Sequence, residues 1–284
     1  MPKLVQRLLV FFVGIPIVIL FILPNFLNKL PFHILLLFFS ICSCVELTNM
    51  LNNKEKTLSK SLLVCLTTSI IITSYLCGLF ISKNDNVNFD YINIVILLCV
   101  LIIFISQIFT KNSFEKSNTN ICNSVFVIIY SGLLPSYISK LTTFDNSTQV
   151  ISLFVILVFI SDSAAWLFGM LFGKGNRGVC KASPNKSIAG FIGAYLGSVF
   201  FVILLKTFVW KNIFNNSNLL SYILLAITVT TASIIGDLAE SVIKRSSGCK
   251  DSGNIILGRG GALDSIDSIL MAAPFYYIII KYII

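Results

Sequence analysis

The stretch "ISLFVILVFISDSAAWLFGMLFG", residues 151–173, decides the fold class. A membrane span needs about 20 mostly apolar residues, and this stretch has that length with a single charged side chain, Asp162. The whole chain has the same character, since only 12% of its 284 residues are charged and its mean hydropathy is +0.91. Because a soluble core does not need so much apolar sequence, we predict an all-α, polytopic integral membrane protein.

Nine windows of this kind predict nine transmembrane helices. They lie at residues 6–28, 31–51, 60–82, 91–109, 120–140, 149–172, 187–209, 219–239 and 268–284. The first window follows Lys3 and Arg7, but it is too long for a signal-peptide core and no A-x-A-like cleavage site follows it. We therefore expect it to remain in the mature protein as a span.

The basic residues set the expected orientation. With a cytoplasmic N-terminus, most of the 21 lysines and arginines fall in cytoplasmic segments, as the positive-inside rule requires. We therefore predict a multi-pass protein of the cell membrane with its N-terminus in the cytoplasm. Topology and contact with anionic lipid headgroups then explain the net charge of +9, so we expect no nucleic-acid partner.

The polar residues divide the chain by role. Residues 1–148 hold about five spans joined by plain polar connectors, so we expect a transmembrane scaffold. Residues 149–284 hold about four spans, and half of the 12 acidic residues of the chain lie after residue 150. We expect this C-terminal membrane region to carry the chemistry, together with cytoplasmic loops at 173–186 and 240–267.

Asp162 is the first polar feature of that region. A carboxylate inside a span costs about 2.5 to 3.5 kcal/mol on insertion scales, so we expect it to face the bundle interior and to have a partner. A structural ion pair or a hydrogen bond between helices is the alternative.

The loop that follows, "GKGNRGVCKASPNKSIAG" (173–190), contains four basic residues. Ser183 and Pro184 predict the N-cap and first residue of the next helix. The alternative role for the four basic residues is positive-inside topology alone.

Further acids occur at helical spacing near the end of the eighth expected span. Asp237, Glu240 and Lys244 are separated by three and four residues and therefore share one helical face. We interpret them as part of a site, with internal salt bridging as the alternative.

The stretch "KRSSGCKDSGNIILGRGGALDSIDS" (244–268) is the most charged part of this region. Its glycines, Gly258, Gly260 and Gly261, permit a tight turn whose amides can point at an anion. Asp264 and Asp267 then lie on one face at the entry to the last span, where helix capping is the alternative role.

Several carboxylates in a site rich in lysine and arginine suit chemistry at a highly anionic centre. Carboxylates bind divalent cations, above all Mg²⁺, that hold phosphate oxygens, and basic side chains neutralise the charge that develops during transfer. At the cytoplasmic surface of a bilayer, such a site could join a soluble nucleotide to a lipid phosphate.

The same residues form a known pattern. Ser241, Lys244-Arg245, Lys250-Asp251, Gly253, Gly260-Gly261, Asp264 and Asp267 keep the order and spacing of a family signature. The pattern resembles S-x-x-K-R-x4-K-D-x-G followed by a glycine turn and two acids, the signature of the phosphatidate cytidylyltransferases, also called CDP-diacylglycerol synthases. The segment "GDLAES" (236–241) is similar to a family G-D-L-x-E-S. The resemblance covers most of residues 155–270, and the N-terminal spans match only in being hydrophobic.

The resemblance implies a nucleotidyltransferase of phospholipid biosynthesis. It would transfer CMP from CTP to phosphatidate and so form CDP-diacylglycerol and pyrophosphate at a site facing the cytoplasm. Mg²⁺ is the implied cofactor, with room for a second cation. The expected partners are CTP, phosphatidate and membrane lipids, with a homodimer allowed.

Residue roles follow from the same resemblance. As metal ligands we expect Asp237 and Asp264 first, then Asp251 and Asp267, and we count these four as catalytic together with Lys250. The expected substrate-binding residues are Ser183, Lys186, Ser241, Lys244, Arg245, Arg259, Gly260 and Gly261. Asp162 and Glu240 would order basic side chains or a second cation.

Four positions depart from the family pattern: Ala189, Leu257, Arg259 and Ser265 replace Glu, Pro, His and Arg. These departures support one alternative, a relative that keeps the fold and has lost catalysis. A membrane transporter is the second alternative, although it predicts paired broken helices in place of a long charged loop. A CDP-alcohol phosphotransferase needs a D-G-x-x-A-R core, which this sequence lacks.

Overall fold

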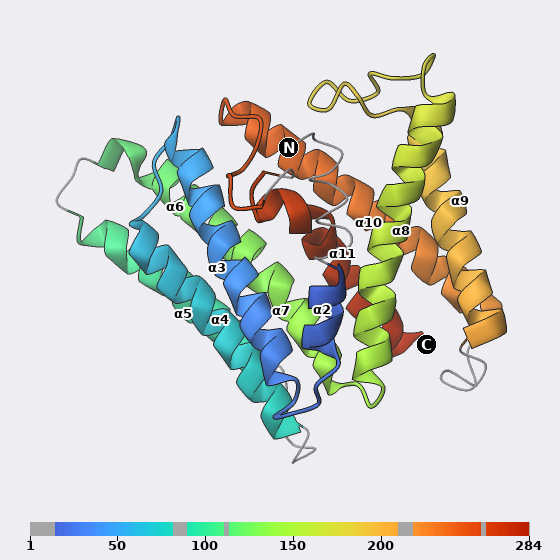
Figure 1. The fold of residues 1–284 in the computed structure, drawn as a ribbon. Coiled ribbons are helices and arrows are strands. Elements are labelled where there is room, and N and C mark those ends of the chain that lie inside the picture. Colours follow the sequence, from blue (N-terminus) through green and yellow to red (C-terminus); the bar gives the residue numbers. More distant parts are fainter. Residues whose placement is uncertain (1–14, 82–89, 111–113, 210–217, 257–259, 284) are drawn as a thin grey trace. The chain divides into compact units, whose positions relative to one another are not determined.

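The computed structural model describes residues 15–81, 90–110, 114–209, 218–256 and 260–283 (Figure 1). Every regular element within these ranges is a helix, and the only β-type pairing there consists of three isolated bridges in two loops. The all-α fold class predicted from the sequence is therefore confirmed.

Eight helical segments of the described ranges are long and apolar enough to cross a membrane. Their helices are α3 (Leu30–Asn52), α4 (Lys60–Ile81), α5 (Asp90–Ile108), α6 (Ser117–Ile128) continuing through a π-helical turn (Ile129–Leu133) into α7 (Leu134–Lys140), α8 (Ser147–Phe172), α9 (Ile188–Leu204), α10 (Leu219–Ser246) and α11 (Leu263–Tyr282). The protein is thus a multi-pass membrane protein, as its hydropathy predicts.

The ninth expected span, at residues 6–28, lies partly outside the described residues. Within them, α2 (Ile15–Ile22) ends six residues before the expected boundary. Leu27, Asn28 and Lys29 then adopt left-handed backbone conformations, which turn the chain into α3. The buried Lys29 stabilises this turn because its Nζ donates a 2.8 Å hydrogen bond to the Ile22 carbonyl at the end of α2.

The end of α10 also differs from the sequence prediction. Helix α10 continues beyond residue 239 to Ser246, so Asp237, Glu240 and Lys244 lie in one unbroken helix. An ion pair at i, i+4 between Glu240 and Lys244 supports these last turns. Gly248, with φ of 74°, follows the helix in the left-handed conformation that commonly ends one.

The N-cap of α9 and the start of α11 also differ from the sequence prediction. The N-cap of α9 is Ser187, whose Oγ accepts a 3.1 Å hydrogen bond from Gly190 N, so the predicted cap at Ser183 is wrong. Ser183 instead pairs with Cys180 in the preceding loop. Helix α11 begins at Leu263, five residues before the expected start, so both Asp264 and Asp267 belong to it.

The chain folds as two compact units. Unit 1 comprises residues 1–148 together with 246–265, and unit 2 comprises residues 149–245 together with 266–284. Unit 1 thus includes the loop between α10 and α11. The division by role that the sequence suggests, into a scaffold and a region that carries the chemistry, stays a prediction.

In unit 1, helices α3, α4 and α7 pack against one another (Figure 1). Buried serine hydroxyls bond to backbone carbonyls of neighbouring helices, as in the contacts from Ser40 to Ser131 O and from Ser74 to Ser136 O. Such bonds satisfy small polar groups where no water is present.

In unit 2, helices α8 and α9 approach closely along glycines of α9 (Figure 1). A Cβ added at Gly193 would lie 2.4 Å from the Cβ of Phe168, and one at Gly197 would lie 2.4 Å from the Cβ of Ala164. Helix α11 packs on α8 through Tyr276, whose hydroxyl donates a 2.7 Å hydrogen bond to Val150 O. These contacts fix the helices that carry the polar side chains of unit 2.

We predict that Gly193→Ala lowers the stability of the protein, because the new methyl group would overlap Phe168 and force α8 and α9 apart. Overpacking of this kind costs about 1 to 3 kcal/mol. The measurement is the thermal unfolding midpoint in detergent, with Gly175→Ala as the control, since a Cβ at Gly175 meets no atom within 4 Å. Equal midpoints for the two variants would contradict this account of the helix contact.

Candidate functional site

The polar side chains of unit 2 gather around Lys186. This lysine belongs to the loop before α9 and forms an ion pair with Asp237 of α10. Burial lowers the pKa of Lys186, but the carboxylate of Asp237 and those of Asp162 and Asp267 outweigh it, so that the pKa lies above its usual value. Lys186 is therefore a stable cation next to acids from α8, α10 and α11.

Asp267 is the most buried of these three aspartates, with 6% of its surface exposed. Its Oδ1 accepts a 2.7 Å hydrogen bond from Ser268 N. A Cβ at Gly236 would lie 2.7 Å from the backbone oxygen of Asp267, so the absence of a side chain there lets α10 and α11 meet. Asp237, the next residue, is thereby held close enough to Asp267 to interact with it electrostatically.

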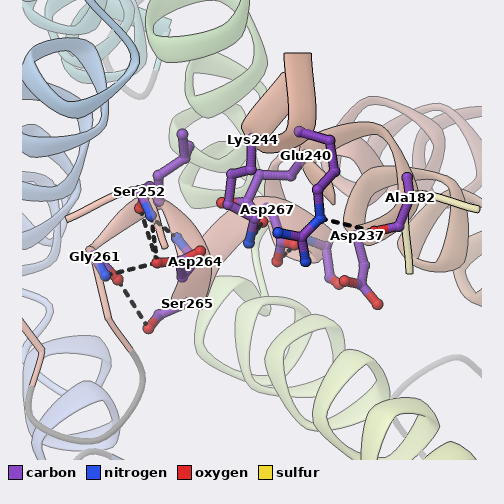
Figure 2. A network of polar contacts seen from close by, with 12 residues as sticks. Ala182, Asp237, Glu240, Lys244, Ser252, Gly261, Asp264, Ser265 and Asp267 are labelled. Carbon is purple, nitrogen blue, oxygen red and sulfur yellow. Dashed lines mark hydrogen bonds and ion pairs between the residues drawn. The ribbon is translucent and has the colours of Figure 1, made fainter. Parts of the chain in front are cut away.

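A second ion pair lies further along α10. Glu240, which is 1% exposed, pairs with Lys244, whose side chain is 14% exposed. The internal salt bridge considered as an alternative for these residues is therefore present. In the next position, Arg245 donates from Nε to Ala182 O at 3.3 Å, which connects the end of α10 to the loop before α9 (Figure 2). We call Asp162, Lys186, Asp237, Glu240, Lys244 and Asp267 the helix cluster.

Unit 1 contains the other half of the signature, in the loop between α10 and α11. Asp264 Oδ2 accepts hydrogen bonds from Ser252 N at 2.9 Å, Ser252 Oγ at 3.0 Å and Gly261 N at 2.7 Å (Figure 2). Gly260 has φ of 108°, and a Cβ there would lie 2.5 Å from the same carboxylate oxygen. Gly260 and Gly261 thus lie against Asp264, and the anion that the Gly261 amide binds is a side chain of the protein.

The sequence reasoning missed one acidic residue of this loop region, Glu46 of α3. It is 3% exposed and accepts hydrogen bonds of 2.9 Å from Ala262 N, Leu263 N and Ser252 Oγ. The signal was present, because a single carboxylate inside the apolar stretch 31–51 is as unusual as Asp162. We call Glu46, Asp251, Ser252, Gly260, Gly261 and Asp264 the loop cluster.

The four predicted metal ligands belong to two units: Asp237 and Asp267 to unit 2, Asp251 and Asp264 to unit 1. In the part of the chain that the structure describes, no three His, Cys, Asp or Glu side chains are grouped to hold a metal ion. Mg²⁺ nevertheless needs only one or two carboxylates when water and substrate phosphates supply the other ligands. Asp237 and Asp267 fit such a site, whereas Asp264 Oδ2 is already used by three donors.

The other predicted residues have the following places. Asp162 is exposed and not buried, but its charge acts on Lys186 and on Asp267, so the expected partner is present. Ser241 is buried in α10, whereas Lys250 and Asp251 are exposed in the loop. Arg259, with Leu257 and Gly258, lies outside the described residues.

The fold and these clusters define a class: a multi-pass helical membrane protein in which two acidic residues of α10 pair with lysines, Asp237 with Lys186 and Glu240 with Lys244. The cytidylyltransferase family model matches residues 5–283, nearly the whole chain. The chain belongs to the cytidylyltransferase family.

Individual relatives bear a more specific name. The phosphatidate cytidylyltransferase of Haemophilus influenzae is 39% identical over 121 residues, which cover 43% of this chain and 42% of the relative. The enzyme of that name from Staphylococcus saprophyticus is 31% identical over 175 residues, or 61% and 63% of the two chains. That from Thermotoga maritima is 32% identical over 188 residues, or 65% and 68%. This chain therefore spans less than two thirds of the length of the first two relatives.

We predict that Asp264→Ala opens the loop between α10 and α11, because three hydrogen bonds to Oδ2 are lost together. Trypsin should then cleave after the exposed Lys250 at least several-fold faster than in the wild type, as measured by the appearance of the peptide in mass spectrometry. Ser265→Ala is the control, since Ser265 Oγ makes only a 3.4 Å contact with Gly261 O. An unchanged rate in Asp264→Ala would show that Asp264 does not hold the loop.

Proposed function

We propose that this protein transfers CMP from CTP to phosphatidate and so forms CDP-diacylglycerol and pyrophosphate. Membership of the cytidylyltransferase family and the name shared by its relatives support the proposal. The observation that carries it is the helix cluster, in which Lys186 lies among three aspartates from three helices. Such a mixture of charges suits substrates that bring several phosphates into one site.

In the proposed reaction, an oxygen of the phosphatidate phosphate attacks the α-phosphorus of CTP. A new P–O bond forms there, and the bond to the β-phosphate oxygen breaks, so pyrophosphate leaves with the electron pair. Phosphatidate is already largely ionised near neutral pH, so the attack requires no strong general base. The task of the protein is then to bring two anions together and to stabilise the charge of the leaving group.

The basic residues of the site are the candidates for this task. Lys186, Lys244 and Arg245 are proposed to bind phosphate oxygens, with Lys250 and Arg259 of the loop in the same role. The raised pKa of Lys186 keeps its ammonium group protonated at neutral pH. Its partner Asp237 and the partner of Lys244, Glu240, hold these cations in place before substrate binds.

Asp237 and Asp267 are proposed to hold Mg²⁺, with the exposed Asp162 nearby for a second cation. When bound, Mg²⁺ neutralises charge on phosphate oxygens. Asp251 of the loop and Asp264 in the first turn of α11 are proposed to shape the turn at Gly260 and Gly261.

The proposed location is the cell membrane, with the site facing the cytoplasm where CTP is available. The distribution of lysine and arginine supports this orientation. A homodimer stays a prediction of the sequence. Family membership disfavours the transporter alternative. The chain retains every acidic and basic signature residue except those at the four departures, and this disfavours a relative without catalysis.

We expect purified protein in detergent to form CDP-diacylglycerol from CTP, phosphatidate and Mg²⁺, detected by mass spectrometry. Removal of divalent cations with EDTA should abolish product formation, and added Mg²⁺ should restore it. Asp237→Asn should lower the rate at least 100-fold, because the change removes a proposed cation ligand and the partner of Lys186.

The matched control is Asp145→Asn, since Asp145 is an exposed aspartate in the connection before α8. This variant should retain the wild-type rate. No product from well-folded wild-type protein, across other nucleotides and divalent cations, would overturn the proposed function and favour a relative without catalysis.

A further inference from the structure

Glu46 lies outside the signature, yet it accepts three hydrogen bonds from the signature loop and the start of α11. Neither of the ion pairs found among the described residues includes it. A carboxylate buried in an apolar helix is costly unless strong hydrogen bonds satisfy it. Glu46 receives three such bonds, and all three come from the loop between α10 and α11 or from the start of α11.

Two of these bonds begin α11. Oε1 accepts from Ala262 N and Oε2 accepts from Leu263 N, each at 2.9 Å. The first amides of a helix have no partner within the helix, and a negative charge at this end interacts favourably with the helix dipole. Glu46 therefore serves as an N-terminal cap supplied by a different helix, 217 residues away in the sequence from Leu263.

The third bond connects Glu46 to Asp264. Ser252 Oγ lies 2.9 Å from Glu46 Oε2 and 3.0 Å from Asp264 Oδ2. A hydroxyl has a single hydrogen, so Ser252 bridges the two carboxylates and is shared between them. Ser252 thus links Glu46 to the carboxylate that also accepts from Gly261 N.

Two glycines of the signature leave space for Glu46. A Cβ at Gly253 would lie 2.5 Å from Oε1, and a Cβ at Gly261 would lie 2.3 Å from Oε2 and 2.0 Å from Ser252 Oγ. Neither glycine has a left-handed backbone, so glycine is needed at both positions because there is no room for a Cβ and not because of the backbone conformation. For Gly253, the three atoms nearest to the added Cβ all belong to Glu46.

We propose that Glu46 is a positioning residue for the transfer reaction. It fixes the first turn of α11 and, through Ser252 and Asp264, the loop that carries Lys250 and Asp251. Glu46 acts through these residues and does not contact substrate. This role rests on the proposed function, because a positioning residue is defined by the reaction that it supports.

The central test is Glu46→Gln, which keeps the size of the side chain but replaces one acceptor oxygen with a donor. At least one of the three bonds is then lost, and an NH₂ group faces another donor. We expect kcat to fall at least 10-fold, with KM for CTP and for phosphatidate changed less than 3-fold and with the unfolding midpoint close to that of the wild type. Glu46→Asp, which keeps both oxygens, should recover part of the lost kcat.

Glu55→Gln is the matched control, since Glu55 is an exposed glutamate just after α3. It should leave kcat unchanged. Wild-type kcat in Glu46→Gln would overturn the proposal. So would a loss of activity that only follows the loss of folded protein.

A double-mutant cycle tests the same contact from the loop side and does not depend on Glu46→Gln being well folded. Gly253→Ala should lower kcat in the wild-type background, because its methyl group displaces Glu46. In the Glu46→Ala background the same change should have no further effect, since the space is empty. Independent, multiplicative effects of the two changes would contradict the proposed link.

Cleavage by trypsin after Lys250 separates this proposal from the proposed function. Glu46→Gln should accelerate cleavage if Glu46 holds the loop, whether or not the assay detects CDP-diacylglycerol. Inactive wild-type protein with accelerated cleavage in the variant would overturn the transfer function and the role of Glu46 in it, leaving only a loop contact. Unchanged cleavage together with unchanged kcat would overturn the positioning role itself.

Discussion

An acidic side chain in an apolar helix must receive hydrogen bonds or lie next to a cation, and this constraint organises both units of the protein. In unit 2, Asp237 is satisfied by Lys186 and the buried Glu240 by Lys244. In unit 1, the buried Glu46 is satisfied by two backbone amides and a hydroxyl. The two solutions have different consequences, since an ion pair keeps a cation ready for an anionic substrate and amide bonds fix the backbone.

The loop between α10 and α11 links the ion pairs of α10 to the hydrogen bonds of Glu46 along the chain. It leaves α10 just after Lys244 and Arg245, forms the loop cluster within unit 1, and returns to α11 at Leu263. Within its described residues, backbone and hydroxyl donors are used by Glu46 and Asp264. Lys250 and Asp251 are exposed charged side chains of this loop, which leaves them available for ligands.

The hydropathy of the sequence predicted the fold class and the approximate place of eight spans, because length and apolar character suffice for that purpose. It did not predict the ends of the helices. Helix α11 begins early because Glu46, distant in sequence, caps it, and α10 ends late because an ion pair and two basic residues favour its last turns. Local sequence rules placed the cap of α9 at Ser183, whereas Ser187 bonds to Gly190 N.

The sequence predicted the candidate site only in part, as it did the helices. The spacing of Asp237, Glu240 and Lys244 predicted a shared face, which the unbroken helix α10 provides. The hydrogen-bond partners could not be predicted, since the donors to Asp264 and Glu46 are mostly backbone amides, which leave no trace in residue identity.

The central claim is the transfer of CMP, and CTP labelled with radioactive phosphorus at either the α- or the γ-position tests it most directly. We predict that α-label enters the organic-soluble lipid while γ-label remains in water-soluble pyrophosphate; γ-label in the lipid, or no label in it from either position, would contradict the account.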